Sequence, residues 1–126
     1  MSNVFSDQRK FMRACDQIVD QFDESQYNMY LKLIREEYHE LELAYGQRNR
    51  VEELDALIDI LVVTVGALHS LGVDAEGAWK EVMRSNFAKI DKKTGKVRKR
   101  EDGKVLKPVG WEPPRLAGFL NSEHRE

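Results

Sequence analysis

The sequence predicts an all-α protein, a bundle of four to five helices followed by a basic and mostly irregular C-terminal extension. Two observations predict this class. Apolar residues recur at intervals of three and four from about residue 5 to residue 90, as they do on one face of a helix. Beyond Ile90 the periodicity stops, and turns that contain glycine or proline alternate with lysine and arginine. We expect one domain, 1–126, with a helical core over about 5–90 and a basic tail over 91–126.

The first two helices are predicted from their caps and their apolar spacing. Ser6 is a candidate N-cap for the first helix. The apolar residues at helical spacing after it are Phe11, Met12, Cys15, Ile18, Val19 and Phe22. A second helix is expected to begin at Asp23 or Ser25, to run to Tyr45 and to be closed by Gly46.

The third and fourth helices follow a short polar turn. The third is expected over about 51–71, closed by Gly72, and it is apolar nearly all round after Asp55. Such a helix should be the central and most buried one. Asp74 is expected to cap a fourth helix that ends near Lys89. Its predicted buried face consists of Trp79, Val82, Met83 and Phe87.

Two groups of acids interrupt the apolar faces of the second and third helices. They are Glu36, Glu37 and Glu40 in one helix, and Glu52, Asp55 and Asp59 in the next. At about 100° per residue each group covers one helix face that continues in apolar residues, so we expect these acids to face the interior. Two carboxylates about 4 Å apart repel by about 4 kcal/mol at an effective dielectric of about 20, so several together need a cation. Oxygen ligands of this kind suit Mg²⁺, and Mn²⁺ could substitute for it.

Other interpretations of the acids stay open. They could form a solvated helix face, or pair with lysine or arginine from elsewhere in the chain. They could also belong to a catalytically silent helical interaction module, in which they pair with the basic tail of a neighbouring subunit. Glu36 and His39 also have the ExxH spacing of di-iron carboxylate bundles. Such bundles use two copies of that motif and this chain has one, so we interpret His39 as a surface or packing residue.

The charge distribution indicates an anionic ligand at the C-terminal end. Nine lysines and arginines but three acids lie between residues 89 and 107, although the whole chain is close to neutral. Closure of this tail over phosphates is one interpretation, and a solvated tail is another. Nucleic-acid binding is disfavoured because aromatic residues are sparse in the tail and no nucleic-acid motif is present. Trp111 could cover a base or fasten the tail to the helices.

Composition also bears on the compartment. Cys15 is the single cysteine, which excludes an internal disulfide and makes a reducing cytoplasm the default expectation. The first ten residues lack the apolar region of a signal peptide. The longest apolar run, 58–68, contains Asp59 and is too short to span a bilayer. We therefore expect a cytoplasmic protein without a membrane partner.

These motifs together resemble the all-α nucleoside triphosphate pyrophosphohydrolase superfamily, which includes MazG, phosphoribosyl-ATP pyrophosphohydrolase and dimeric dUTPases. Glu36, Glu37 and Glu40 match the EExxE motif of the family. The segments DILVVTVGALHSLGVDAEGAWKEVMRSNFAK (59–89) and GKVLKPVGWEPPRL (103–116) look like the MazG-like branch with dUTPase-type members. The sequence departs from the family at one place. The apolar register puts Asp59 at the aspartate of the family's ExxD motif, and Ala56 then stands where its glutamate should be, so that Asp55 or Glu52 must substitute.

The resemblance implies a Mg²⁺-dependent hydrolase that converts a (d)NTP and water to (d)NMP and pyrophosphate, in nucleotide-pool cleansing or dUTP removal. The alternatives are phosphoribosyl-ATP cleavage in histidine synthesis and the non-catalytic helical module. The implied metal ligands are Glu36, Glu37, Glu40, Asp55 and Asp59, of which all but Asp55 are also the implied catalytic residues. The implied substrate-binding residues are Asn86, Lys89, Lys104, Lys107 and Trp111. Because four helices leave little protein to enclose such a site, we expect a homo-oligomer, either a dimer or a tetramer.

Overall fold

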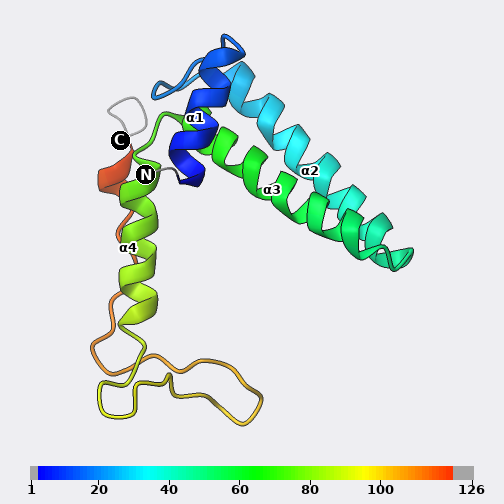
Figure 1. Cartoon of the computed structure of the whole chain (residues 1–126). Helices are drawn as coiled ribbons and strands as arrows, with labels where there is room; N and C mark the ends of the chain where they lie inside the picture. Colours follow the sequence, from blue (N-terminus) through cyan, green and yellow to red (C-terminus); the bar gives the residue numbers. More distant parts are fainter. Residues whose placement is uncertain (1–2, 121–126) are drawn as a thin grey trace.

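The computed structural model describes residues 3–120, which form four α-helices and an irregular basic segment (Figure 1). The helices are α1 (Val4–Ala14), α2 (Glu24–Gly46), α3 (Arg50–Leu71) and α4 (Ala75–Phe87), and a 3-10 turn covers Ala117–Phe119. Within the described residues, β-pairing is limited to two isolated antiparallel bridges, Ile90 with Val97 and Lys99 with Val105. The all-α class predicted from the sequence is therefore confirmed, and the tail contains the short hairpin-like turns that its glycines suggested.

Side-chain caps fix the helix ends close to where the sequence placed them. The carboxylate of Asp23 accepts a hydrogen bond from the backbone N–H of Gln26 at the start of α2 (2.9 Å), and that of Asp74 accepts from Gly77 at the start of α4 (3.0 Å). Gly72 ends α3 in the left-handed conformation, with φ of 77°, which glycine adopts without steric cost.

The first helix differs from the prediction at both ends. Asn3, not Ser6, is its N-cap, and the two side chains form a reciprocal capping box. The helix stops at Ala14, and Asp16 and Asp20 have positive φ. The predicted apolar stripe is therefore interrupted, and the chain continues to Asp23 in an irregular segment.

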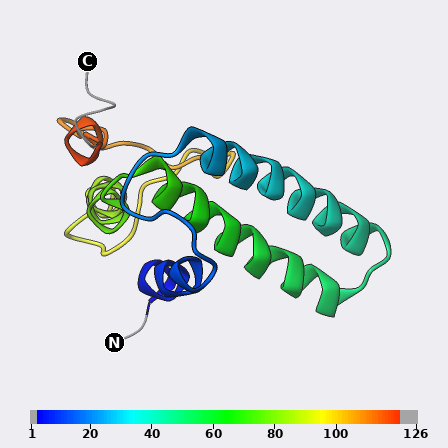
Figure 2. The ribbon, with the colours of Figure 1, turned by 90° about the horizontal axis from the view of Figure 1, so that it is seen from above.

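α2 and α3 form a long antiparallel hairpin, and α1 packs across the C-terminal half of α3 (Figures 1 and 2). The small core contains Met12, Tyr30 and Ala67. Gly66 is required where the two long helices touch, since a Cβ at this position would lie 2.7 Å from ring atoms of Tyr30. The buried Ser70 also joins the helices, because its hydroxyl accepts a hydrogen bond from the Gln26 side chain (2.8 Å).

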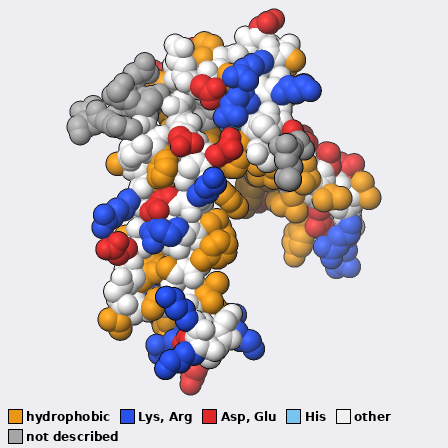
Figure 3. Space-filling view, turned by 60° about the vertical axis from the view of Figure 1, so that its left-hand side comes forward, with side chains coloured by type: hydrophobic (Ala, Val, Ile, Leu, Met, Phe, Trp, Pro, Cys, Tyr) orange, Lys and Arg blue, Asp and Glu red, His pale blue; other side chains and the backbone are white. Residues whose placement is uncertain are grey.

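α4 leaves the hairpin and projects to one side, so the chain has two limbs (Figure 1). In the space-filling view, hydrophobic side chains gather on the sides of the limbs that face the hollow between them (Figure 3). The predicted buried face of α4 is consequently wrong for a single chain, because Trp79 is 58% exposed and Phe87 is 61% exposed. α3 is the central helix, but only its C-terminal half is well buried. In its N-terminal half, Leu54 is 62% exposed and Leu57 is 52% exposed.

The basic arm, which we define as residues 89–116, returns along α4. The Arg84 guanidinium donates to the backbone oxygens of Glu112 and Pro113 (both 3.4 Å). The backbone N–H of Arg115 donates to the Glu81 carboxylate (2.7 Å). Hydrogen bonds from Arg84 and then from Arg115 lower the pKa of Glu81 to about 2. The arm is thus fastened to α4.

By length and composition, α3 is the one described helix that could cross a membrane. Core helices of water-soluble proteins meet the same criterion. Asp59 lies in the middle of α3, and α2 packs along it.

Candidate functional site

The predicted acids of α2 and α3 meet across the hairpin. Glu37 and Asp59 are half-buried on the two helices. Burial, then the charges of Glu40, Asp59 and Asp55, raise the pKa of Glu37. Burial is the first cause that raises the pKa of Asp59, and the negative charges of Asp55 and Glu40 raise it further. These mutual effects define one group, the carboxylate cluster, which consists of Glu37, Glu40, Asp55 and Asp59.

No cationic side chain compensates the carboxylate cluster within the described residues. None of the ion pairs there includes one of its four members, and no lysine or arginine is among the groups that shift the pKa of Glu37 or Asp59. Oε2 of Glu37 is buried and has no hydrogen-bond partner. A buried carboxylate oxygen of this kind costs free energy unless something binds it. This arrangement argues against the alternative in which the acids pair with basic residues of their own chain.

The cluster is more open than the sequence suggested. Glu40 and Asp55 are exposed, and within residues 3–120 no group of three or more His, Cys, Asp or Glu side chains is close enough to hold a metal ion as placed. The expectation that all of the acids face the interior is therefore wrong for a single chain. The donor set nevertheless fits a hard divalent cation, because it offers only carboxylate oxygens and one of them lacks a partner.

Glu36 and Glu52 are not among the groups that shift the pKa of Glu37 or Asp59. Glu36 is exposed and lines a cavity of about 470 Å³ along α2, which it shares with Glu40 of the cluster and with Lys32, Arg35 and His39. Glu52 is exposed in the first turn of α3. Asp55 and Glu52 are the two acids that could substitute for the missing family glutamate. Of these, Asp55 is the one whose charge raises the pKa of Glu37 and Asp59. Ala56, which stands at the position of that glutamate, is buried.

Four of the predicted substrate-binding residues also come together, at the far end of α4. The indole N–H of Trp111 donates to the backbone oxygen of Ser85 (2.7 Å), which fixes the ring against the helix. Nζ of Lys89 lies 5.1 Å from the centroid of this ring, and Nζ of Lys107 lies 4.8 Å from it. The Lys89 ammonium also donates to the Asn86 side-chain oxygen (3.2 Å).

Lys104, the fifth predicted residue, is not part of this group. It lies in the exposed turn of the arm, where its backbone N–H donates to the Asp102 carboxylate (3.1 Å). The structure thus places Lys104 within a turn and leaves its side chain exposed.

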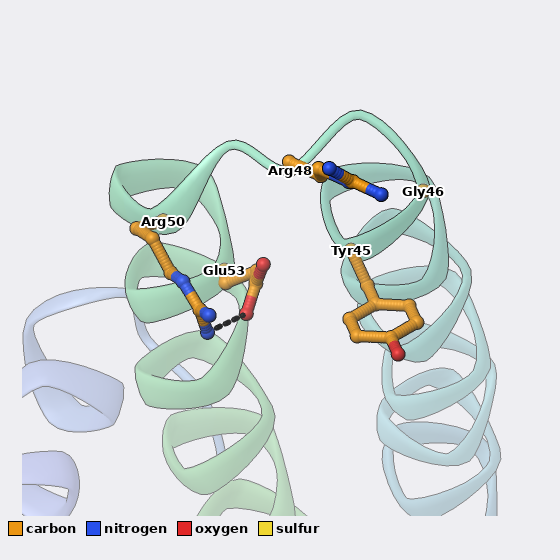
Figure 4. Close-up of a pocket in the computed structure, with 5 residues that line it drawn as sticks. All are labelled: Tyr45, Gly46, Arg48, Arg50 and Glu53. Atoms are coloured by element: carbon orange, nitrogen blue, oxygen red, sulfur yellow. Dashed lines mark hydrogen bonds and ion pairs between the residues drawn. The ribbon is translucent and has the colours of Figure 1, made fainter.

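A cavity that the sequence did not predict lies at the tip of the α2–α3 hairpin (Figure 4). It has a volume of about 510 Å³ and is lined by Tyr45, Gly46, Arg48, Arg50 and Glu53. Arg50 is paired with Glu53 (3.4 Å), and Arg48 has a positive φ of 55°. The sequence feature that could have indicated this cavity is the pair of arginines, Arg48 and Arg50, in and next to the polar turn. None of the predicted site residues lines this cavity.

Comparison with protein-family models matches residues 8–86, more than half of the chain, to the phosphoribosyl-ATP pyrophosphohydrolase family. No curated protein matches the chain. The matched range includes the whole carboxylate cluster and ends at Asn86, before the basic arm. The chain therefore belongs to the phosphoribosyl-ATP pyrophosphohydrolase family, whose members are hydrolases that act on phosphoric anhydride bonds.

Proposed function

We propose that the protein is a Mg²⁺-dependent nucleoside triphosphate pyrophosphohydrolase that releases pyrophosphate and leaves a nucleoside monophosphate. The observation that carries this proposal is the carboxylate cluster, in which no cation of the same chain compensates the acids and one buried oxygen of Glu37 lacks a partner. Membership of a pyrophosphohydrolase family agrees with it.

The chemistry of the site follows from its charges. Glu37, Glu40, Asp55 and Asp59 would hold the cation, which when bound neutralises charge on the phosphates and on the leaving pyrophosphate. The bond that breaks joins the α-phosphorus to the oxygen bridging it to the β-phosphate, while a new bond forms from water oxygen to the α-phosphorus. Glu36 is the candidate base for the proton of that water, since it is exposed one residue from Glu37. Lys89 and Lys107 would bind the outer phosphates, and Asn86 would orient sugar or phosphate.

A panel of deoxynucleoside and ribonucleoside triphosphates, scored for pyrophosphate with and without Mg²⁺, tests the proposal. We expect Mg²⁺-dependent release from at least one member of the panel, with Mn²⁺ able to replace Mg²⁺. Glu37→Gln and Asp59→Asn should each lower kcat by at least about a hundredfold, because each removes a charge that stabilises the transition state through the cation. Unchanged turnover in both variants would remove the metal-site assignment.

Substrate preference separates a role in nucleotide-pool cleansing or dUTP removal from the second candidate, phosphoribosyl-ATP cleavage in histidine synthesis. The second candidate is favoured by the family match. It predicts a high kcat/KM on phosphoribosyl-ATP and a low one on free dNTPs. Including phosphoribosyl-ATP in the same panel decides between them.

A further inference from the structure

The cavity at the tip of the α2–α3 hairpin has the size of a small-molecule site. Its volume of about 510 Å³ lies within the range of such sites, about 300–1,000 Å³. Figure 4 shows Tyr45 on the α2 side and the paired Arg50 and Glu53 on the α3 side. Arg48 lies at the turn that joins the two helices. The cavity thus offers two guanidinium groups, a carboxylate and an aromatic ring to a ligand.

The turn that carries Arg48 is held in one conformation. The backbone N–H of Asn49 donates to the Ala44 oxygen at the end of α2 (2.9 Å), and the Asn49 side chain accepts from the backbone N–H of Glu52 at the start of α3 (3.1 Å). Arg48 has a φ of 55°, in the left-handed region that a residue with a Cβ occupies at a cost in free energy. Glycine would occupy this position at a lower cost, so the backbone does not explain an arginine there.

The guanidinium groups of the cavity are accessible to an anion. Arg48 is exposed, and among residues 3–120 it takes part in no ion pair. Arg50 is paired with Glu53 (3.4 Å), but its side chain is 89% exposed and keeps further donors for a ligand. A planar guanidinium group binds phosphate oxygens through two parallel hydrogen bonds. The anion that suits this end of the cavity is therefore a phosphate.

The other lining groups indicate a ligand that carries more than a phosphate. Tyr45 is 73% exposed, and an uncovered aromatic ring can stack on a nucleobase. The half-buried Glu53 repels a bare anion, but it accepts hydrogen bonds from sugar hydroxyls or from the amino group of a base. A nucleoside monophosphate presents a phosphate, a sugar and a base together.

We propose that the cavity at the hairpin tip binds a nucleoside monophosphate. Arg48 and Arg50 bind its phosphate, and Tyr45 stacks on its base. Glu53 accepts hydrogen bonds from its sugar or its base. This site shares no lining residue with the carboxylate cluster, and its single carboxylate does not require a divalent cation. The inference goes beyond the proposed function and does not depend on it.

Binding measurements in EDTA test the inference, because the proposed site at the carboxylate cluster binds nucleotides through a cation. AMP, CMP, GMP, UMP and inorganic phosphate are titrated separately into the full chain by calorimetry. We expect at least one of the four nucleotides to bind once per chain and at least about tenfold more tightly than inorganic phosphate, because stacking on the ring adds to the phosphate contacts. Equal affinities for phosphate and all four nucleotides would overturn the assignment to a nucleotide. A lack of binding by all five probes would overturn the site itself.

Two variants remove the site and preserve the hairpin. Arg48→Gly takes away a guanidinium group and relieves the left-handed backbone, so it should weaken nucleotide binding at least about tenfold while the thermal midpoint stays equal or rises. Gly46→Leu places a side chain in the cavity, where nothing lies within 4 Å of an added Cβ, and should weaken binding as well. Lys107→Ala, in the group around Trp111, is the control and should leave the affinity unchanged. Binding that is lost in Lys107→Ala and kept in Arg48→Gly would place the nucleotide elsewhere and overturn the inference.

Glu53→Met gives a readout that a merely structural role of Glu53 would not produce. The change removes the negative charge and releases Arg50, so inorganic phosphate should bind more tightly. It also removes the acceptor for the sugar or the base, so the preference for the nucleotide over inorganic phosphate should fall by at least about tenfold. An unchanged preference would overturn the assignment of the cavity to a nucleotide.

Discussion

Glu37 is the cluster residue whose surroundings stabilise its negative charge least. Its half-buried carboxylate has three acidic neighbours and an oxygen without a partner, so the fold tolerates a charge that it does not stabilise. Such conflicts are typical of functional sites, where a side chain is positioned for a ligand and not for stability.

Glu37→Gln should therefore stabilise the protein in EDTA, by about 1 kcal/mol, because it removes a repelled charge and supplies an amide that can donate to the neighbouring carboxylates. Urea unfolding in EDTA measures the change. Glu42→Gln, at an exposed position of α2, is the control and should have little effect. Mg²⁺ should raise the thermal midpoint of the wild type and not that of the Glu37 variant. A loss of stability in EDTA would contradict this account of Glu37.

Asp55 and Glu52 allow a matched comparison. Of these two acids, Asp55 raises the pKa of both Glu37 and Asp59 and Glu52 raises neither, so Asp55→Asn should weaken Mg²⁺ binding while Glu52→Gln should not. Loss of an outer-shell partner alone typically costs 10–100-fold in metal affinity, so we expect a loss of at least about tenfold for Asp55→Asn. Titration calorimetry with Mg²⁺ gives the two affinities directly. Equal effects of the two changes would place Glu52 in the site as well.

His69 makes stability depend on pH. Its ring is fully buried in α3, its Nε2–H donates to the Phe5 backbone oxygen (2.9 Å), and its buried Nδ1 has no partner. Burial is the first cause that lowers its pKa below 6.5. Arg9 lowers it too, and the Phe5 oxygen, Asp20 and Glu76 oppose the shift. The unfolded chain therefore binds a proton at His69 more readily than the folded chain does. The stability that the neutral, buried His69 contributes is complete above pH 6.5 and is lost as the pH falls through the folded-state pKa.

His69→Gln should reduce this dependence, since a glutamine amide can keep the bond to Phe5 but does not titrate. Denaturant unfolding between about pH 5 and about pH 8, either side of the ordinary histidine pKa, measures it. The exposed His39→Gln is the control and should leave the slope unchanged. An equal slope in wild type and His69→Gln would show that other groups cause the acid sensitivity.

At the residue scale, the sequence identified the acids but not their arrangement. Periodicity places Glu36 and Glu37 on adjacent parts of one face, yet Glu36 faces solvent and Glu37 is half-buried. The difference depends on the contact between α2 and α3, which a single helical period does not specify. The sequence likewise gave the same predicted role to Lys104 and Lys107. Only the fold of the arm brings Lys107, and not Lys104, to the Trp111 ring.

At the scale of the elements, Gly66 sets how closely α2 and α3 approach. Gly66→Ala should destabilise the protein by about 1–3 kcal/mol, because the new methyl group overlaps the Tyr30 ring and the hairpin must open to admit it. Gly46→Ala, where nothing lies within 4 Å of the added Cβ, is the matched control and should be neutral or slightly stabilising. Thermal unfolding of both variants provides the measurement. Equal midpoints would show that the helices do not touch at Gly66.

Helix ends were predictable where a local signal defines them. Asp23, Asp74 and Gly72 act through their own side chains or φ angles, and all three ends are found where the sequence placed them. The end of α1 has no glycine or proline to mark it. It depends on Asp16 and Asp20 in the left-handed region and on the Gln26 side chain, which donates to the Ile18 backbone oxygen (2.6 Å). That contact comes from α2, so the sequence of α1 alone could not reveal it.

For the whole molecule, the apolar pattern predicted a buried face on α4 that the single chain leaves exposed. Trp79 and Phe87 have the spacing of a buried face, but both side chains are exposed in the single chain. The same holds for the acids and the basic arm, whose charges are complementary but lie on separate limbs. A periodicity argument treats every apolar face as the inside of one chain, so it cannot separate a face that the fold buries from one that the fold leaves exposed.

The exposed apolar faces predict that stability depends on protein concentration. If association covers them, folding and assembly are linked, and each tenfold rise in concentration adds about 1.4 kcal/mol per dimer. The thermal midpoint should then rise by a few degrees per tenfold, and mass measurements in solution should give a multiple of 14.6 kDa. Trp79→Asp places a charge in the apolar face of α4 and should abolish the dependence. Asn28→Asp, on the side of α2 opposite Glu37, adds the same charge elsewhere and should preserve it. A monomeric mass with a midpoint independent of concentration would mean that the two limbs remain open in solution, and the site would then have to be built from one chain alone.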